Sequence, residues 1–132
     1  IYNLPVANVG SDFETCSGEN FTLGAQPAAS GGSPSTTYSY SWRNYNDVEI
    51  STSANPSLNL VNATTQDSIY IFKLIVTDNF TLCQSLEEEV AVTVHPNPTV
   101  NITVNSNYAY NDPLVNLVGN PSGTSGVFSG PG

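Results

Sequence analysis

A seven-residue stretch, Thr37–Arg43, alternates between small polar and large aromatic side chains. In an extended strand successive side chains point to opposite faces, whereas a helix would scatter these aromatic residues around its axis. One face of the stretch therefore carries Tyr38, Tyr40 and Trp42. This period of two predicts a half-buried β-strand, with Trp42 in a core rather than on an exposed binding platform.

Further segments show strand signals at short intervals, and turn-forming residues separate them. The strongest is Ser68–Thr77, where Tyr70 to Val76 alternate on one face and isoleucines fill the other, so we expect a central strand covered on both sides. Ser30–Pro34 is expected to be a turn. The other expected strands are 5–9, 20–24, 48–53, 56–61 and 90–94.

Seven strands at this spacing, with the only tryptophan on the third, predict an all-β, immunoglobulin-like antiparallel β-sandwich. Its expected core residues are those on the inward faces of these strands: Phe21, Leu23, Trp42, Leu58, Leu60, Tyr70, Phe72, Leu74, Val76, Val90, Val92 and Val94.

The strand pattern restarts after Pro98. Val100–Val104 follows this proline as Val6–Val9 follows Pro5, which gives an offset of 93 residues between the two prolines. Leu114–Val118 is expected to be the next strand of the new unit. We therefore predict a sandwich over residues 1–98, and in residues 99–132 the start of a second β repeat that is cut off before it can close.

The chain is strongly acidic, with a net charge of −9. A nucleic-acid binder needs lysine and arginine to neutralise phosphates, and an anionic membrane surface would repel this chain, so neither is an expected partner. Solubility through self-repulsion explains the acids most simply. The alternative is a calcium site, for which Asp12, Asp47 and Asp78 stand in three separate turns, because calcium prefers oxygen ligands.

Two cysteines, Cys16 and Cys83, suggest an exported protein in an oxidising compartment, because the chain has no metal-binding cysteine motif. We expect them to form a disulfide within the domain. The turns that hold them belong at opposite ends of a plain sandwich, however, and a disulfide needs Cα atoms within about 7 Å. A bond between neighbouring repeats is therefore the alternative.

No arrangement of residues favours catalysis. His95 is the only histidine and stands at a strand end, which favours an exposed side chain over a member of a Ser-His-Asp triad. The acids Asp47 and Glu49 lie two residues apart and are expected on a solvated face. Tyr45, Tyr108 and Tyr110 fall in expected loops, where an aromatic ring could contact a glycan or a protein.

Short motifs along residues 1–98 resemble, in order, polycystic-kidney-disease-like (PKD-like) and related immunoglobulin-like repeats of large secreted surface proteins of Bacteroidota. One departure is Trp42–Asp47, which reads Trp-Arg-Asn-Tyr-Asn-Asp where typical PKD domains have Trp-Asp-Phe-Gly-Asp-Gly. The resemblance rests on Pro5–Asp12, Cys16–Gly18, Phe21–Leu23, Tyr38–Trp42, Ala54–Pro56, Tyr70, Val76–Asp78 and Cys83.

The resemblance implies a non-catalytic structural or adhesive repeat at the cell surface or outside the cell. Its partners would be the neighbouring repeats of the same polypeptide, and surface glycans or proteins. The alternative that the resemblance leaves open is an accessory module, binding carbohydrate or protein, of a secreted polysaccharide-degrading enzyme.

Overall fold

The computed structural model describes residues 1–34 and 36–101. The chain divides into two units, Ile1–Asn97 and Pro98–Gly132, and the first is described below. Tyr108, Tyr110 and the strand expected at Leu114–Val118 lie outside the described residues. Within those residues no helix has the length and apolar character needed to cross a membrane. The strands are β1 (Pro5–Ala7), β2 (Phe13–Cys16), β3 (Asn20–Thr22), β4 (Ala29–Gly31), β5 (Tyr38–Asn44), β6 (Glu49–Ser51), β7 (Ser57–Asn59), β8 (Ser68–Asp78) and β9 (Glu88–His95).

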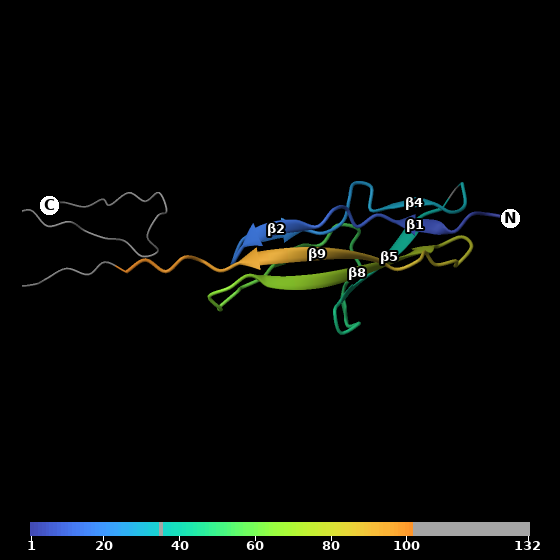
Figure 1. Cartoon of the computed structure of the whole chain (residues 1–132). Helices are drawn as coiled ribbons and strands as arrows, with labels where there is room; N and C mark the ends of the chain where they lie inside the picture. Colours follow the sequence, from blue (N-terminus) through green and yellow to red (C-terminus); the bar gives the residue numbers. More distant parts are fainter. Residues whose placement is uncertain (35, 102–132) are drawn as a thin grey trace, which may run out of the picture. The chain divides into compact units, whose positions relative to one another are not determined.

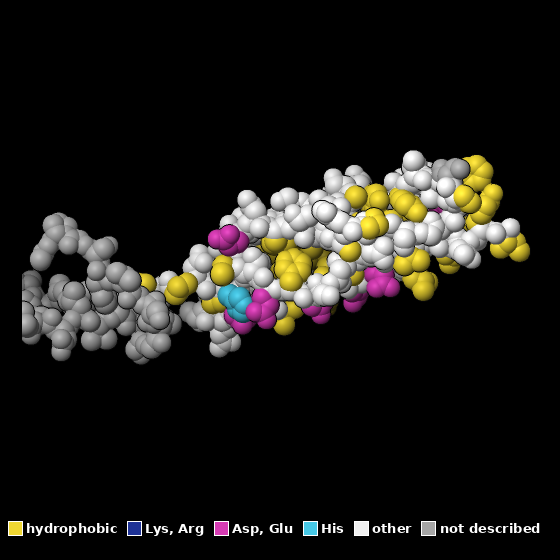
Figure 2. Space-filling model, turned by 90° about the horizontal axis from the view of Figure 1, so that it is seen from above, with side chains coloured by type: hydrophobic (Ala, Val, Ile, Leu, Met, Phe, Trp, Pro, Cys, Tyr) yellow, Lys and Arg dark blue, Asp and Glu magenta, His cyan; other side chains and the backbone are white. Residues whose placement is uncertain are grey.

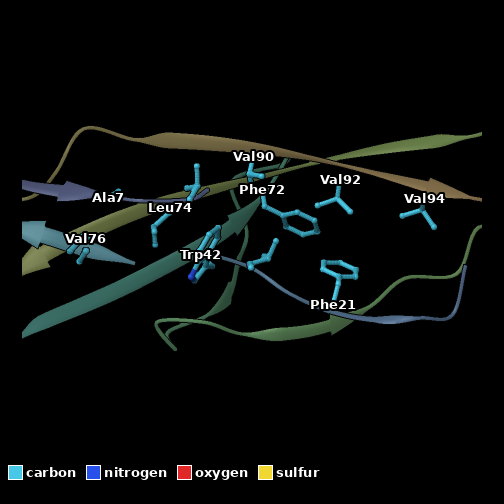
Figure 3. Close-up of a cluster of buried hydrophobic side chains, with 12 residues drawn as sticks. Ala7, Phe21, Trp42, Phe72, Leu74, Val76, Val90, Val92 and Val94 are labelled. Atoms are coloured by element: carbon cyan, nitrogen blue, oxygen red, sulfur yellow. The ribbon is translucent and has the colours of Figure 1, made fainter. Parts of the chain in front are cut away.

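The strands form an all-β sandwich, as the sequence predicts. A five-stranded sheet has the order β2-β9-β8-β5-β6, and two ribbons, β1–β4 and β3–β7, lie over it (Figure 1). Every pair is antiparallel except β2 and β9, which run parallel. The core fills the space between the sheet and the ribbons (Figure 3).

Strand β8 is central because it pairs with β5 on one side and β9 on the other. Its even-numbered residues point into the core, and Leu74 and Val76 are fully buried. The expectation that its other face is also covered is wrong: Ile69 is 67% exposed, and Ile71 and Ile75 are only partly buried. In residues 1–34 and 36–101 no second layer packs on this face, because both ribbons cover the opposite side of the sheet.

Two strands, β2 and β4, were not predicted from the sequence pattern. Strand β2 has only four residues and pairs through its backbone with β9, so its sequence shows little hydrophobic contrast. Strand β4 begins before the expected turn Ser30–Pro34 and overlaps it. Its register with β1 ends at Gly31, where the chain enters a left-handed conformation with φ of 70° that glycine adopts without steric cost.

The expected core is largely confirmed. Trp42 is completely buried opposite Leu74, and its indole N–H donates to the Ala54 carbonyl at 3.3 Å. Leu58, Leu60 and Tyr70 are partly buried and pack against the cluster. The β1–β4 ribbon and the segment after β1 add small core residues that the sequence pattern did not predict: Ala7, Val9 and Ala29.

Truncation of Trp42 to alanine should lower the free energy of unfolding by about 3–5 kcal/mol, because it leaves a large cavity between the two layers. Chemical denaturation followed by far-ultraviolet circular dichroism measures this loss. Tyr45→Ala, at a side chain that is 73% exposed, is the matched control and should change stability little. A Trp42→Ala variant as stable as the parent would contradict the observed burial.

Candidate functional site

A buried carboxylate, Asp78, holds together the end of the sandwich where β8 finishes. Its Oδ2 accepts the Ser33 backbone N–H at 2.7 Å, and its Oδ1 accepts the Phe80 N–H at 2.8 Å and the Thr36 hydroxyl. Gly32 leaves room for this contact, since a Cβ there would lie 2.6 Å from Oδ2. Asp78 therefore joins the loop after β4 to the turn after β8.

Hydrogen bonding sets the ionisation of Asp78. Burial by itself raises the pKa of this carboxyl, but the Thr36 hydroxyl and the backbone N–H groups of Ser33, Phe80 and Thr81 lower it, and the net pKa is below its usual value. All of these partners are donors, so Asp78 is satisfied as an anion without a cation.

The three aspartates proposed for calcium do not come together. Asp12 Oδ1 accepts the Ala91 N–H at 2.9 Å beside β9, and Asp47 lies in the β5–β6 turn, 2.9 Å from the Lys73 ammonium. The hydrogen bond from Lys73 lowers the pKa of Asp47. In residues 1–34 and 36–101 no group of three acidic, histidine or cysteine side chains is placed to hold a metal ion. A calcium site shared by Asp12, Asp47 and Asp78 is therefore not formed.

At the opposite end of β8, His95 links three segments. Its Nδ1 lies 2.8 Å from Asp67 Oδ1, and its Nε2 lies 3.0 Å from Glu14 Oε2 on β2. Figure 2 shows the histidine, in cyan, next to acidic side chains in magenta. The hydrogen bond to Asp67, and then that to Glu14, raises the pKa of His95 above its usual value. Because both ring nitrogens contact carboxylates, His95 has no free nitrogen to act as the base of a serine nucleophile.

The sequence pattern missed this cluster. His95 is separated from Asp67 by 28 residues and from Glu14 by 81, so no local motif connects them. The parallel register, with Cys16 opposite His95, brings Glu14 into reach. A prediction of the β2–β9 pairing would have been the only signal available.

The structure corrects the expected disulfide within the domain. Cys16 and Cys83 are free and exposed. Cys16 ends β2 opposite His95, near the start of β8, while the Cys83 carbonyl accepts the Asp78 N–H at the end of β8. The ten residue steps of β8 span roughly 33 Å, at about 3.3 Å per residue, far more than a disulfide can bridge.

Tyr45, one of the expected contact residues, lies at the mouth of a groove. The groove has a volume of about 520 Å³, and no charged side chain lines it. Tyr45 is 73% exposed, and Ile69, which also lines the groove, is 67% exposed. The lining residues are Asn44, Tyr45, Asn46, Ile69, Tyr70, Ile71 and Phe72. This is a concave, uncharged surface with an aromatic ring at its edge.

The sandwich and its two hydrogen-bonded ends define an immunoglobulin-like β-domain module. A family model described as "K319L-like, PKD domain" matches residues 10–94, more than half of the chain, and the chain belongs to this family. Membership indicates a non-catalytic β-domain.

One similar solved structure is a nucleoside hydrolase-related hypothetical protein from Saccharophagus degradans that is associated with carbohydrate metabolism. It shares 18% identity with a TM-score of 0.46, and the match covers 71% of this chain and 26% of that chain. The chain thus corresponds to about a quarter of that protein's length. No curated protein matches the chain.

Replacement of Asp78 by asparagine should destabilise the domain, because an amide nitrogen would face donors that now meet a carboxylate oxygen. The lowered pKa also sets a direction with pH. The stability that ionised Asp78 contributes is present above about pH 4, the carboxyl's ordinary pKa, and is lost as pH falls through the folded pKa. Asp78→Asn should therefore have a lower melting temperature at neutral pH and a weaker acid dependence than the parent. Asp47→Asn, on the exposed turn, is the control that should change both quantities less.

The raised pKa of His95 predicts the opposite dependence. Protonated histidine can donate to both Asp67 and Glu14, so its contribution is fully present below the unfolded pKa of about 6.5 and is lost as pH rises through the folded pKa. The melting temperature should therefore fall as pH rises from about 6.5, the ordinary histidine pKa, through the higher folded pKa. His95→Gln should remove most of this slope, and an unchanged slope in that variant would contradict the assignment.

Proposed function

We propose that this domain is a non-catalytic, load-bearing repeat of a large secreted or cell-surface protein. Its partners are neighbouring repeats of the same polypeptide, and its place is outside the cell. Membership of the PKD-like family supports a module without catalysis. The observation that carries the mechanical role is the parallel pairing of β2 with β9.

The two ends of the domain lie at opposite poles. Strand β1 starts at the pole that holds the N-terminus, and β9 runs toward the other pole (Figure 1). Tension between the ends would pull β2 and β9 in opposite directions along their common axis. The four residue pairs from Phe13↔Val92 to Cys16↔His95 then carry the load together, in shear, rather than opening one at a time.

Side-chain contacts reinforce this pair at both of its ends. Asp12 accepts the Ala91 N–H before the paired segment begins, and Glu14 contacts His95 near its end. After β2, the Ser17 N–H donates to the His95 carbonyl at 2.9 Å. The load path is therefore tied by backbone and side-chain contacts over its whole length.

The second candidate is an accessory module that binds carbohydrate or protein. The groove beside Tyr45 favours it, because binding sites are usually concave surfaces lined by aromatic and apolar side chains. The two roles use different parts of the sheet and do not compete.

Single-molecule force spectroscopy of residues 1–97, held at its two ends, tests the mechanical role. Ser17 donates to β9, so Thr15, two residues earlier, faces the same strand, and Thr15→Pro removes a donor from the middle of the pair. We expect this variant to unfold at a clearly lower force. Leu58→Ala, which weakens the β3–β7 ribbon away from the load path, should keep the parental force despite lower thermodynamic stability. Equal forces for Thr15→Pro and the parent would reject the load-bearing role.

A further inference from the structure

Strand β8 loses its neighbour on one side near its start. It pairs with β9 from Ser68 to Leu74, but its pairing with β5 runs only from Asp78 to Phe72, where Asn44 is the partner. Residues 68–71 therefore have a strand on one side only. The gap is the floor of the groove beside Tyr45.

A fixed turn keeps this gap open. Asn44 Oδ1 accepts the backbone N–H groups of Asn46 at 2.9 Å and of Val48 at 3.1 Å, which turns the chain away from β8. Asp47, with φ of 60°, ends the turn and is held by Lys73. Strand β5 therefore cannot extend along residues 68–71 without breaking these contacts.

The ladder register identifies the backbone groups that face the gap. Alternate residues of an antiparallel strand point their N–H and C=O groups to opposite neighbours. The Val76 carbonyl accepts the Ser85 N–H on the β9 side, so the even-numbered residues of β8 face β9. The N–H of Ala91, which lies opposite Ile71, points away from β8 to Asp12, as this register requires.

The N–H and C=O groups of Ile69 and Ile71 consequently face the gap. In the part of the chain that the structure describes, no hydrogen bond joins them to the β5–β6 turn. The groove thus presents two donors and two acceptors on one strand edge, two residues apart.

We propose that this open edge binds an extended peptide segment of a partner protein, which adds as a strand beside β8 in the place that β5 leaves vacant. This inference deepens the second candidate function. Backbone groups repeating every second residue match the backbone of another strand, and strand addition derives its affinity from such main-chain bonds. A saccharide would instead need several polar side chains directed at its hydroxyl groups. Among the lining residues, only Asn44 and Asn46 have amide side chains.

The surroundings define the chemistry of the peptide. Ile69 and Ile71 present apolar side chains on the exposed face of the sheet, and the exposed Tyr45 lines the same groove. β-Branched residues at alternating positions of the peptide therefore fit beside them. The groove itself is uncharged, and the net charge of −9 repels acidic segments. The fitting partner is an uncharged or basic strand.

Hydrogen exchange of the ¹⁵N-labelled chain tests the edge first. In the free protein the amides of Ile69 and Ile71 should exchange fast, while those of Tyr70 and Phe72, bonded to β9, exchange slowly. The probe is the peptide acetyl-Thr-Val-Lys-Val-Thr-Val-amide at about 1 mM, a concentration suited to weak contacts. It should slow exchange at Ile69 and Ile71 at least about tenfold, the change that 1.4 kcal/mol of added stability produces. The control peptide, with the same side chains but N-methylated at every peptide bond, should have no effect.

Two variants test where on the surface the peptide binds. Tyr45→Ser should weaken peptide binding about threefold to tenfold, the effect of losing an exposed aromatic contact. Phe80→Ser, at an aromatic residue that is 69% exposed beyond the far end of β8, should leave binding unchanged. Both side chains are on the surface, so both variants should keep the parental melting temperature.

Four results would overturn the inference. Slow exchange of Ile69 and Ile71 in the free protein would show that the edge is already closed. Equal binding of the N-methylated peptide would show that side chains alone make the contact, and no response to the parent peptide would show that no strand is added. Chemical-shift changes at Tyr45 with cellohexaose but not with the peptide would keep an accessory binding role and assign it to glycans. None of these results affects the β2–β9 pair, so the load-bearing role stands or falls separately.

Discussion

Strand β8 organises the sandwich because it is paired on both sides and turns every second side chain into the core. Its pairing with β5 sets Leu74 opposite Trp42, and its pairing with β9 sets Phe72 opposite Val90. Each large apolar side chain buried in this way contributes about 1.5–3 kcal/mol. A shift of one residue in either register would turn these side chains to solvent, so the hydrophobic pattern itself selects the pairing.

Polar contacts then fix what the core leaves undetermined at the two ends of β8. At one end Asp78 gathers donors from the loop after β4 and from its own turn. At the other end His95 bridges β2 and the segment before β8. The hydrogen-bond clusters around Asp78 and His95 respond oppositely to pH. The Asp78 cluster requires an ionised carboxylate, whereas the His95 cluster is strongest with a protonated ring. The domain is therefore expected to be most stable between the two titrations.

The sequence was informative where side-chain alternation was strong and silent where the backbone alone makes the contact. Alternation identified β5, β8 and β9 and the core around Trp42. It could not identify β2, whose role depends on parallel pairing with a strand almost 80 residues away, as in Phe13↔Val92. It also could not show that Ile69 faces solvent, because an isoleucine-rich face looks the same whether or not a layer covers it.

The same physical reason explains which expectations about the candidate residues agree with the structure. Tyr45 was expected in a loop, where an aromatic ring could contact a partner. It borders a groove, and its contact with a partner stays a prediction. The three aspartates expected to bind calcium do not come together, because turns far apart in sequence need not meet in space. Each aspartate instead has its own donors: Asp12 the Ala91 N–H, Asp47 the Lys73 ammonium and Asp78 the end loops. The disulfide was wrong for the reason that sandwich topology already suggested, since β8 separates the two cysteines along its full length.

The load path and the open edge lie on different sides of β8. In the proposed mechanical role, tension is carried by β2 and β9, whereas the groove lies on the side from which β5 has turned away. Between them stands the β8–β9 ladder, with seven residue pairs from Ser68↔Val94 to Leu74↔Glu88. A peptide added at Ile69 and Ile71 would extend the sheet without joining the sheared pair. The two proposed roles, binding and load bearing, can therefore coexist in one domain, because they use different sides of β8.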